Sequence, residues 1–594
     1  MNPQSAKDSF DVVIIGAGTA GSLLAARLSH SATLQILALE AGENRNDDAN
    51  VRTPGLQRNV LGNPAYDWQY QTAPEPWLNG RVILQPRGKL WGGSKNDEWN
   101  NLFGRGDGKI GPTWDWEGVG KYYRKIPTTT AAKRGRQTGA GHWTPGNSGF
   151  FPHYPHVLQR AWTTAIRDLG YSSEKDPVGG AVIGGSTTTT AIDASKGERS
   201  YAGIVFLEPS TINQENVRVR SNVLVERIVF DNKVLGGNLV ATGIVYSQEG
   251  RECVTVFARR EVIICAGTYG SPKLLELSGF GRRDRLAAAG IKCLRELSGV
   301  GENLQDHLNF GPSVEVLDSI DTMDIAARDP VVAEAEQRLY DTKHKGPLAE
   351  RAAYSFTYLP LQASNSEQEE HELEKIVEKA LRDSLPTASR GLQAQYGIIR
   401  RMIYDPEEAT STVFMVCKQS YTQPSEPMPG NNMSIIAMLS YPFSRGTSHI
   451  SNSVAKTNPE IRFNYLQHPL DAEILARHVL HISKTLDLPA LSALLKHGGN
   501  TLPAGYSRQI AAAEDVKVFL HQFAATNYHP VGTCAMMREG LDGVVDENLR
   551  VYGTADVRIC DASVIPILPR RNILSTVYTV AEKAADLIEE DLKA

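Results

Sequence analysis

The first clear pattern along the chain is a short apolar run, a set of glycines, and then two further apolar runs. Residues 11–42 read DVVIIGAGTAGSLLAARLSHSATLQILALEAG. The run 12–15 is β-branched throughout, which is typical of a buried parallel strand. Apolar residues continue over 23–28 as a helix, and 34–39 forms the next strand. The chain therefore opens with a predicted strand–turn–helix–strand unit.

Similar patterns return later in the chain. Alternating apolar and polar residues over 216–231, 240–247 and 253–258 predict strands of a sheet that partly faces water. Residues 260–279, REVIICAGTYGSPKLLELSG, predict a second strand, tight turn and helix. Helices are expected at 114–126, 157–169 and, at the end of the chain, 575–592.

Residues 310–470 have a different pattern. Strands are predicted over 311–317, 411–417, 431–443 and, after a turn, within 444–450, and the charged stretch 366–384 predicts an exposed helix. This part indicates a separate, largely antiparallel domain. The expected division is 1–155, 216–310 and 519–594 for the first domain, 156–215 for a loop-rich segment of the second, and 311–518 for its main part.

Composition narrows the function classes. With 594 residues and 41% hydrophobic content, the chain can bury a large core. A net charge of −5 without a long basic run argues against a nucleic-acid partner. We find no apolar leader, no stretch of about 18 apolar residues and no S-K-L-type C-terminus, and the six scattered cysteines lack C-x-x-C spacing. These features predict a cytoplasmic protein with no membrane partner, buried free thiols and no metal site.

The glycines of the first unit carry the first chemical signal. Gly16, Gly18 and Gly21 follow the pattern G-x-G-x-x-G, in which they allow a tight turn, approach of a pyrophosphate and close helix–strand packing. Glu40 ends the second strand about 20 residues further on, where a ribose-binding acid is expected. This predicts a dinucleotide site and argues against NADP, whose extra phosphate Glu40 would repel. The stretch alone does not separate FAD from NAD.

Four more segments occur in a set order. They are RGKLWGGS (87–94), GTYGSPKLLELSGFG (267–281), VGENLQDH (300–307), and the pair YHPVGTCAM (528–536) with DASVIPILPRRNILSTVYTVAEKAAD (561–586). Together with the glycine fingerprint they resemble the glucose–methanol–choline (GMC) family of FAD oxidoreductases. The resemblance implies an α/β fold, with a Rossmann-like FAD-binding domain assembled from discontinuous segments and an α+β substrate domain with an antiparallel sheet.

The resemblance also implies a set of FAD contacts. Thr19 and Ala20 would lie at the pyrophosphate, Glu40 and Ala41 at the adenosine ribose, and Val225 at the adenine. The remaining implied contacts lie near the isoalloxazine or the ribityl chain and are Trp91, Gly93, Ser94, Asn100, Asp561, Ala562 and Ile573.

Two residues match the family's catalytic positions. His529 follows an aromatic residue and precedes Pro-x-Gly-Thr, and Asn572 lies on the loop before the last helix. Histidine has a pKa near working pH, so His529 is the expected base that removes the hydroxyl proton while a hydride moves to flavin N5. Asn572 cannot take a proton but can hold the substrate oxygen. The alternative roles are a hydrogen-bonded core histidine and a loop-capping asparagine.

The neighbours of these two residues carry weaker hypotheses. Tyr528 is expected to shape the substrate pocket, with a simple packing role as an equal alternative. Arg570 and Arg571 are unusual for the family at this position. Arg571 is a candidate for binding an anionic substrate or product, against the alternative of an exposed or structural pair.

The first signature loop departs from the family pattern. Lys95-Asn96-Asp97-Glu98-Trp99-Asn100 is one residue longer and charged, so matching Asn100 to the family asparagine needs an insertion. Charged groups next to flavin N5 cost free energy unless they are paired or face solvent. No histidine occurs between residues 88 and 106, where some members attach FAD covalently, so non-covalent FAD is expected.

Three functions are compatible with these residues. The first is FAD-dependent oxidation of an organic alcohol. A bulky or aromatic substrate is expected because 127–195 and 320–410 read as loop-rich, and a secondary-metabolite alcohol is expected by analogy with intracellular members of the family. The electron acceptor would be O2 or another acceptor. The second is a lyase or cyclase that does acid–base chemistry beside a structural FAD, and the charged loop keeps this alternative open. The third, a non-enzymatic flavoprotein, is disfavoured by His529 and Asn572.

Overall fold

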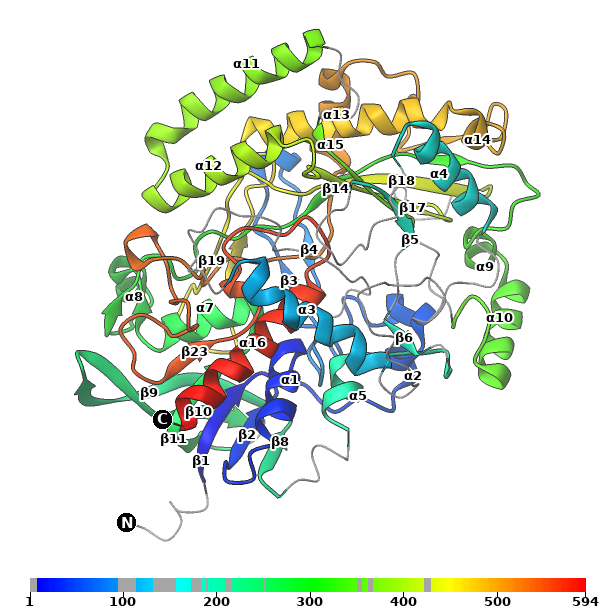
Figure 1. Cartoon of the computed structure of the whole chain (residues 1–594). Helices are drawn as coiled ribbons and strands as arrows, with labels where there is room; N and C mark the ends of the chain where they lie inside the picture. Colours follow the sequence, from blue (N-terminus) through cyan, green and yellow to red (C-terminus); the bar gives the residue numbers. More distant parts are fainter. Residues whose placement is uncertain are drawn as a thin grey trace.

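The computed structural model describes residues 8–93, 114–131, 156–171, 183–187, 191–193, 195–208, 215–248, 251–349, 355–361, 367–420 and 429–593. Within them, two large sheets divide the molecule into a lower and an upper part as drawn in Figure 1. The shorter elements are α2 (Ala49–Arg52), η1 (Pro54–Asn59), β3 (Tyr70–Gln71), η2 (Pro76–Leu78), β4 (Leu84–Gln85), β6 (Ile192–Asp193), β7 (Glu198–Arg199), β12 (Phe280–Gly281), α8 (Arg283–Ala288), β13 (Arg295–Glu296), η4 (Leu385–Thr387), β19 (Thr447–His449), β20 (Glu460–Arg462), α14 (Pro489–Ser492), η5 (Glu539–Leu541) and η6 (Ala562–Val564).

The lower sheet joins segments from both ends of the chain. Its order is β8 (Val217–Arg220), β2 (Ile36–Leu39), β1 (Ser9–Ile15), β11 (Val254–Ile264), β10 (Asn238–Gln248) and β9 (Val223–Leu235), with β23 (Val557–Ile559) paired to β11. The strands from β8 to β11, and β23, run parallel, whereas β10 and β9 are antiparallel additions. Residues 12–15 are wholly buried because both faces of the sheet are covered.

Helices from distant parts of the sequence cover this sheet. α1 (Thr19–Leu28) packs against α16 (Leu574–Lys593) and α5 (Ala202–Phe206), and α16 packs in turn against α3 (Trp116–Ala131). α7 (Gly267–Leu277) lies along β9. The predicted Rossmann-like domain of discontinuous segments is therefore confirmed.

The upper sheet is antiparallel throughout its described strands. Its order is β21 (Thr501–Leu502), β15 (Ser313–Glu315), β18 (Asn432–Leu439), β17 (Ser411–Val416), β16 (Ser355–Leu359) and β5 (Gly184–Thr187). β14 (Leu308–Phe310) joins β18 to β22 (Ala525–Thr526). The covering helices are α4 (Val157–Asp168), α13 (Pro469–Leu486) and α15 (Ala513–Phe523), which confirms the second domain as α+β with an antiparallel sheet.

Two expectations for this upper part are wrong in detail. The strand predicted at 311–317 is only the short strand β15, and β14 precedes it as a separate strand, because Pro312 between them has no N–H to donate to the sheet. Residues 320–410 are mostly helical rather than loop-rich. The helix predicted at 366–384 is observed as α11 (Glu367–Ser384), and α9 (Asp324–Arg328), α10 (Pro330–Lys343) and α12 (Arg390–Tyr404) were not predicted. The domain boundaries themselves stay a prediction.

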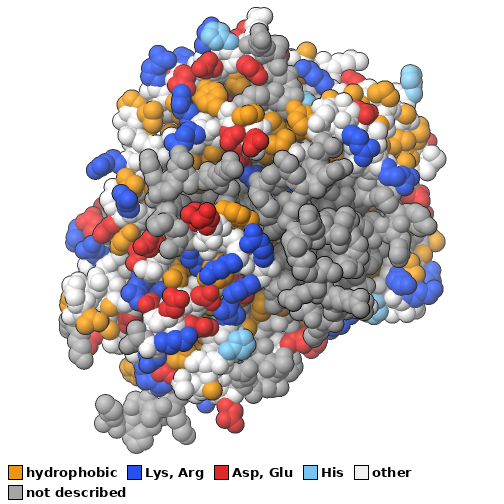
Figure 2. All heavy atoms as spheres, in the orientation of Figure 1, with side chains coloured by type: hydrophobic (Ala, Val, Ile, Leu, Met, Phe, Trp, Pro, Cys, Tyr) orange, Lys and Arg blue, Asp and Glu red, His pale blue; other side chains and the backbone are white. Residues whose placement is uncertain are grey.

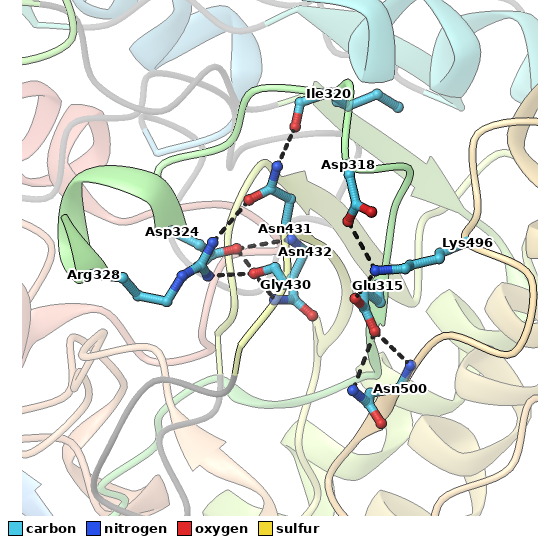
Figure 3. A network of polar contacts seen from close by, with 10 residues as sticks. All are labelled: Glu315, Asp318, Ile320, Asp324, Arg328, Gly430, Asn431, Asn432, Lys496 and Asn500. Atoms are coloured by element: carbon cyan, nitrogen blue, oxygen red, sulfur yellow. Dashed lines mark hydrogen bonds and ion pairs between the residues drawn. The ribbon is translucent and has the colours of Figure 1, made fainter. Parts of the chain in front are cut away.

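α9 and α10 form an arm that reaches from the upper sheet to the lower part. Figure 3 shows the polar network at its root. Asp324 accepts hydrogen bonds from the backbone N–H groups of Gln419 and Asn432, and Glu315 accepts from Lys496 and Asn500. At the far end of the arm the N–H of Gly55 donates to the carbonyl of Leu348 at 2.9 Å. The arm therefore ties the two sheets together beside α2 and η1.

The surface has no single electrostatic character on the face shown in Figure 2, where acidic and basic side chains are interspersed among the described residues. In the described ranges, no helix is both long enough and apolar enough to cross a bilayer. Four of the six cysteines are buried thiols, whereas Cys253 is exposed and Cys293 partly so.

A buried histidine–carboxylate cluster joins α7 to β19. His449 contacts Glu276 at 2.7 Å through Nδ1 and Glu302 at 3.2 Å through Nε2. Burial alone would lower the pKa of His449, but the hydrogen bonds and charges of the two carboxylates raise it above its ordinary value. The folded state therefore favours the protonated form. Its stabilisation is fully present below about pH 6.5 and is lost as the pH rises through the folded pKa.

We expect His449→Gln to remove this pH dependence. The melting temperature of the wild type should fall between pH 6 and pH 8, and that of the variant should fall less. At pH 6, His449→Ala should cost about 3 kcal/mol, because Glu276 would stay buried with its cationic partner gone. Parallel melting curves for wild type and His449→Gln across this range would contradict the assignment.

Candidate active site

A cavity of about 320 Å³ lies at the carboxyl ends of β1, β2 and β11. This is where ligands bind in open parallel sheets. The cavity wall includes many of the predicted cofactor contacts, namely Gly16, Gly18, Thr19, Ala20, Glu40, Ala41, Gly93, Val225, Asp561, Ala562 and Ile573. Residues from five separate stretches of the chain are thus brought together at one place.

The glycines form a cradle of closely packed backbone, in which a larger residue would clash with neighbouring backbone atoms. Gly16 has φ of +99°, and a Cβ on Gly21 would lie 1.9 Å from the carbonyl oxygen of Gly16. Gly93 has φ of +60°, and its Cβ would meet the Cα of Gly18 at 2.8 Å. Gly18 is the N-cap of α1 and offers no side-chain cap, so the positive end of the helix dipole is directed at the cavity. The cradle fits a pyrophosphate.

Glu40 is held in the cavity wall as a buried acceptor. Its carboxylate accepts hydrogen bonds from the N–H groups of Ala17 and Gly42, both at 2.9 Å. Burial raises the pKa of Glu40 to about 7. The carboxylate therefore gains from a further donor, such as a ribose hydroxyl.

Lys273 is a cavity residue that the sequence analysis did not single out. It lies on α7, on the same helical face as Gly270, Leu274 and Leu277, all of which line the cavity. Lys273 is 7% exposed, and burial lowers its pKa to about 8. None of the described residues pairs with its ammonium group. The only sequence signal was a lysine within an otherwise apolar helix face.

Aromatic side chains form another part of the cavity lining. Tyr269 lies edge-on to Tyr70 with ring centroids 5.1 Å apart, and the guanidinium of Arg87 lies over Tyr269. Arg87 also donates to the backbone carbonyl of Tyr528 at 2.9 Å. Tyr528 itself lines the cavity and has φ of +63°.

Some predicted residues lie away from the cavity wall. Trp91 is buried beside the cavity, and its indole N–H donates to Ser221 at 2.8 Å. His529, Arg571 and Asn572 are absent from the lining, although Tyr528, Pro530 and Ile573 next to them belong to it. Ser94 and Asn100, and with them the charged loop 95–99, lie outside the described residues.

His529 is completely buried and held on three sides. Its backbone N–H donates to Asp306 at 2.6 Å, and its Nδ1 lies 2.8 Å from Nδ1 of His307 and 3.4 Å from Nδ2 of Asn527. Asp306 also accepts from Tyr465 and Thr526, which fixes the loop that carries the histidine. Nε2 of His529 has no hydrogen-bond partner among the described residues.

This environment keeps His529 neutral. Burial lowers its pKa well below the ordinary value, and the nearby His307 and Arg87 lower it further. Burial likewise lowers the pKa of His307 to about 3. Two adjacent uncharged imidazoles therefore lie beside the cavity at neutral pH.

The two arginines before Asn572 are both buried. Arg570 pairs with Glu408 at 2.5 Å, and its carbonyl accepts from Thr412 at 2.7 Å. The guanidinium of Arg571 lies 3.8 Å from the ring centroid of Tyr358 on β16. Both side chains thus anchor the 570–572 loop to the upper sheet, so the solvent-exposed alternative is wrong.

Comparison with known proteins agrees with this arrangement. Models of the GMC oxidoreductase family match residues 10–309 and 442–581. A dehydrogenase of Armillaria gallica is 30% identical over 99% of this chain and 94% of its own length. Versicolorin B synthase of Aspergillus parasiticus is 27% identical over 97% of this chain and 88% of its own. The solved structure of an FAD-dependent oxidoreductase from Chaetomium thermophilum has the same fold, with a TM-score of 0.82, 24% identity and coverage of 98% and 100%.

Lys273 allows a test of how the cavity holds its cofactor. A buried ammonium should contribute to binding of the FAD pyrophosphate, so Lys273→Met should raise the dissociation constant about tenfold at pH 7, a change of about 1.4 kcal/mol. Because FAD favours the protonated amine, wild-type affinity should fall as the pH rises above about 8. The measurement is quenching of FAD fluorescence on titration into the apoprotein.

Lys583 provides the matched control for this titration. It is 5% exposed, burial lowers its pKa to about 8, and it lies over Trp114 away from the cavity lining. Lys583→Met should leave both the affinity and its pH dependence unchanged. Equal effects of the two substitutions would show that Lys273 acts only through stability.

Proposed function

The chain belongs to the GMC oxidoreductase family, and on that premise we propose that it oxidises a small-molecule alcohol with FAD as its cofactor. The proposal rests on the environment of His529. It is a buried, neutral imidazole whose Nε2 has no partner among the described residues, and its neighbours Tyr528 and Pro530 line the cofactor cavity. A nitrogen that is neutral at working pH can accept a proton, although burial holds the pKa of His529 below the ordinary value of histidine.

In the proposed reaction His529 takes the hydroxyl proton of the substrate at Nε2. FAD, when bound without a covalent link, supplies the hydride acceptor, so the alcohol becomes a carbonyl compound. Asn572 holds the substrate oxygen by hydrogen bonds, and the Tyr528 ring limits the space beside it. The imidazolium formed at His529 keeps its Nδ1 proton directed at Nδ1 of His307.

Arg571 supports a preference within this substrate class. Its guanidinium is buried against Tyr358, and Arg571 directly precedes Asn572 on the same loop. We propose that it gives the pocket a positive potential that favours an alcohol carrying an anionic or electron-rich aromatic group. The electron acceptor in this proposal is O2 or another small oxidant.

A second candidate function has support from one relative. Versicolorin B synthase is named for a synthase activity and aligns over 97% of this chain. A neutral His529 with an open Nε2 could also serve proton transfer in a cyclisation or elimination beside a structural FAD. In that case the substrate would turn over without reducing the flavin.

We expect one anaerobic titration to separate the two functions. Purified protein with bound FAD is mixed with a panel of primary and aromatic alcohols, and the absorbance band of the oxidised flavin is followed. Oxidation predicts bleaching by at least one alcohol in the wild type and a loss of about 1,000-fold in the bleaching rate in His529→Ala. His529→Ala should still bind FAD, because the histidine is not part of the cavity lining.

Asn572→Ala serves as the control for this titration. Asn572→Ala should weaken alcohol binding more than it slows bleaching at saturation, because it positions the substrate but moves no proton. Product formation in the panel without any bleaching would reject the oxidation and favour the second candidate. Bleaching at wild-type rates in His529→Ala would reject His529 as the base.

A further inference from the structure

His307 is the fully buried neighbour of the proposed base, and the reaction described above gives it no step of its own. We propose that His307 is a positioning residue that fixes His529 in the tautomer whose proton is on Nδ1, and so leaves Nε2 bare to accept a proton. This inference rests on the proposed function only for what Nε2 then does.

Backbone carbonyls decide the tautomer of His307. Nε2 of His307 lies 3.3 Å from the carbonyl oxygen of Ser440, and the carbonyl of Pro569 is a second backbone acceptor of this ring. A carbonyl oxygen can only accept, so Nε2 of His307 must carry a proton. His307 is neutral at working pH, which leaves its Nδ1 without a proton.

The tautomer of His529 follows from that of His307. The two Nδ1 atoms are 2.8 Å apart, a distance at which one must donate and the other accept. Because Nδ1 of His307 is bare, Nδ1 of His529 is the donor. His529 is neutral too, so its Nε2 carries the lone pair that a general base needs.

Asn527 favours the other tautomer of His529, so the tautomer with its proton on Nδ1 needs a further contact to stabilise it. The amide Nδ2 of Asn527 lies 3.4 Å from Nδ1 of His529 and could only donate to it. That contact alone would favour the opposite tautomer, with the proton on Nε2 and pointing at the substrate. The shorter contact with His307 opposes it, and Nδ2 of Asn527 also lies 3.0 Å from Sδ of Met438.

A neutral imidazole is suited to this task where a carboxylate would not be. A carboxylate next to Nδ1 would raise the pKa of His529 and keep it protonated at rest, as in other histidine–acid pairs. His307 orients the ring without that charge. Asp306, the adjacent carboxylate, is directed to the backbone N–H of His529 and to Tyr465, so its charge fixes the loop and not the ring.

The backbone around His307 is rigid enough to set the ring position. The carbonyl of His307 accepts from the N–H of Asn527 at 2.9 Å, and the next residue begins β14, where Leu308 pairs with Thr526 on β22. Ser440 directly follows β18 of the same sheet. The two histidine rings lie edge to face with centroids 5.0 Å apart.

The kinetic test compares two substitutions at this position. His307→Asn keeps an acceptor where Nδ1 was and should stay within about fivefold of the wild-type bleaching rate. His307→Leu removes the acceptor and should lower the rate about 100-fold at saturating alcohol with little change in alcohol affinity, as loss of a group that orients a functional histidine does. The probe is the alcohol of the panel that bleaches the wild-type flavin fastest.

His478→Gln is the matched control for these variants. His478 is also a buried histidine whose pKa is lowered to about 3, and it contacts Thr410 on Oγ1 at 2.9 Å rather than His529. It should reproduce any general loss of stability and leave the bleaching rate unchanged. A loss in His478→Gln equal to that in His307→Leu would overturn the positioning role.

Nitrogen NMR of ¹⁵N-histidine-labelled protein reads the tautomer without any catalysis. The His529 signals are assigned by their loss in His529→Ala. The wild type should show a protonated Nδ1 and a bare Nε2, and His307→Leu should show the reverse. A protonated Nε2 in the wild type would overturn the inference even if alcohols bleach the flavin. The expected signals without bleaching by any alcohol would reject the proposed function and leave the tautomer assignment standing.

Discussion

The site depends on burying the imidazole of His529 while leaving one of its nitrogens without a hydrogen-bond partner among the described residues. Burial of His529 makes its protonated form costly, and the neutral His307 beside it adds no stabilising negative charge. The backbone N–H of His529 donates to Asp306 and its Nδ1 contacts His307, whereas its Nε2 has no hydrogen-bond partner among the described residues. An unsatisfied buried acceptor costs free energy, and such costs are retained where the group has a task.

Holding this imidazole requires segments that are far apart in the sequence. The loop around residue 529 is anchored by Asp306 and by Arg87, and the loop around residue 570 is anchored by Glu408 and Thr412 of the upper part. The glycine cradle belongs to the first 93 residues, and other parts of the cavity lining come from 223–225 and α7. The discontinuous arrangement of the lower sheet brings these walls together, and the α9–α10 arm with its polar root ties the two sheets beside η1.

The local elements with strong periodicity could be predicted from the sequence, and the side-chain partners could not. The strand–glycine–helix unit at 11–42 and the helix at 575–592 were predicted because their apolar spacing matches one period throughout. The orientation of Lys273 into the cavity depends on how α7 packs on β9, which no local pattern states. The sequence did not predict that Arg570 is buried, because its partner Glu408 is distant in sequence. His307 belongs to the family-like segment 300–307, but its contact with His529 forms only because β14 pairs with β22 in the folded protein.

In the proposed arrangement, the open nitrogen of His529 faces a flavin held in the cavity at the ends of β1, β2 and β11. A crystal structure of the FAD-loaded protein tests it most directly. We expect the pyrophosphate to lie against Gly18 and the first turn of α1, and the isoalloxazine to lie beside Gly93. Nε2 of His529 should point at the space over flavin N5 and have no protein partner. A flavin bound elsewhere, or Nε2 of His529 hydrogen-bonded to a protein group in the loaded enzyme, would contradict it.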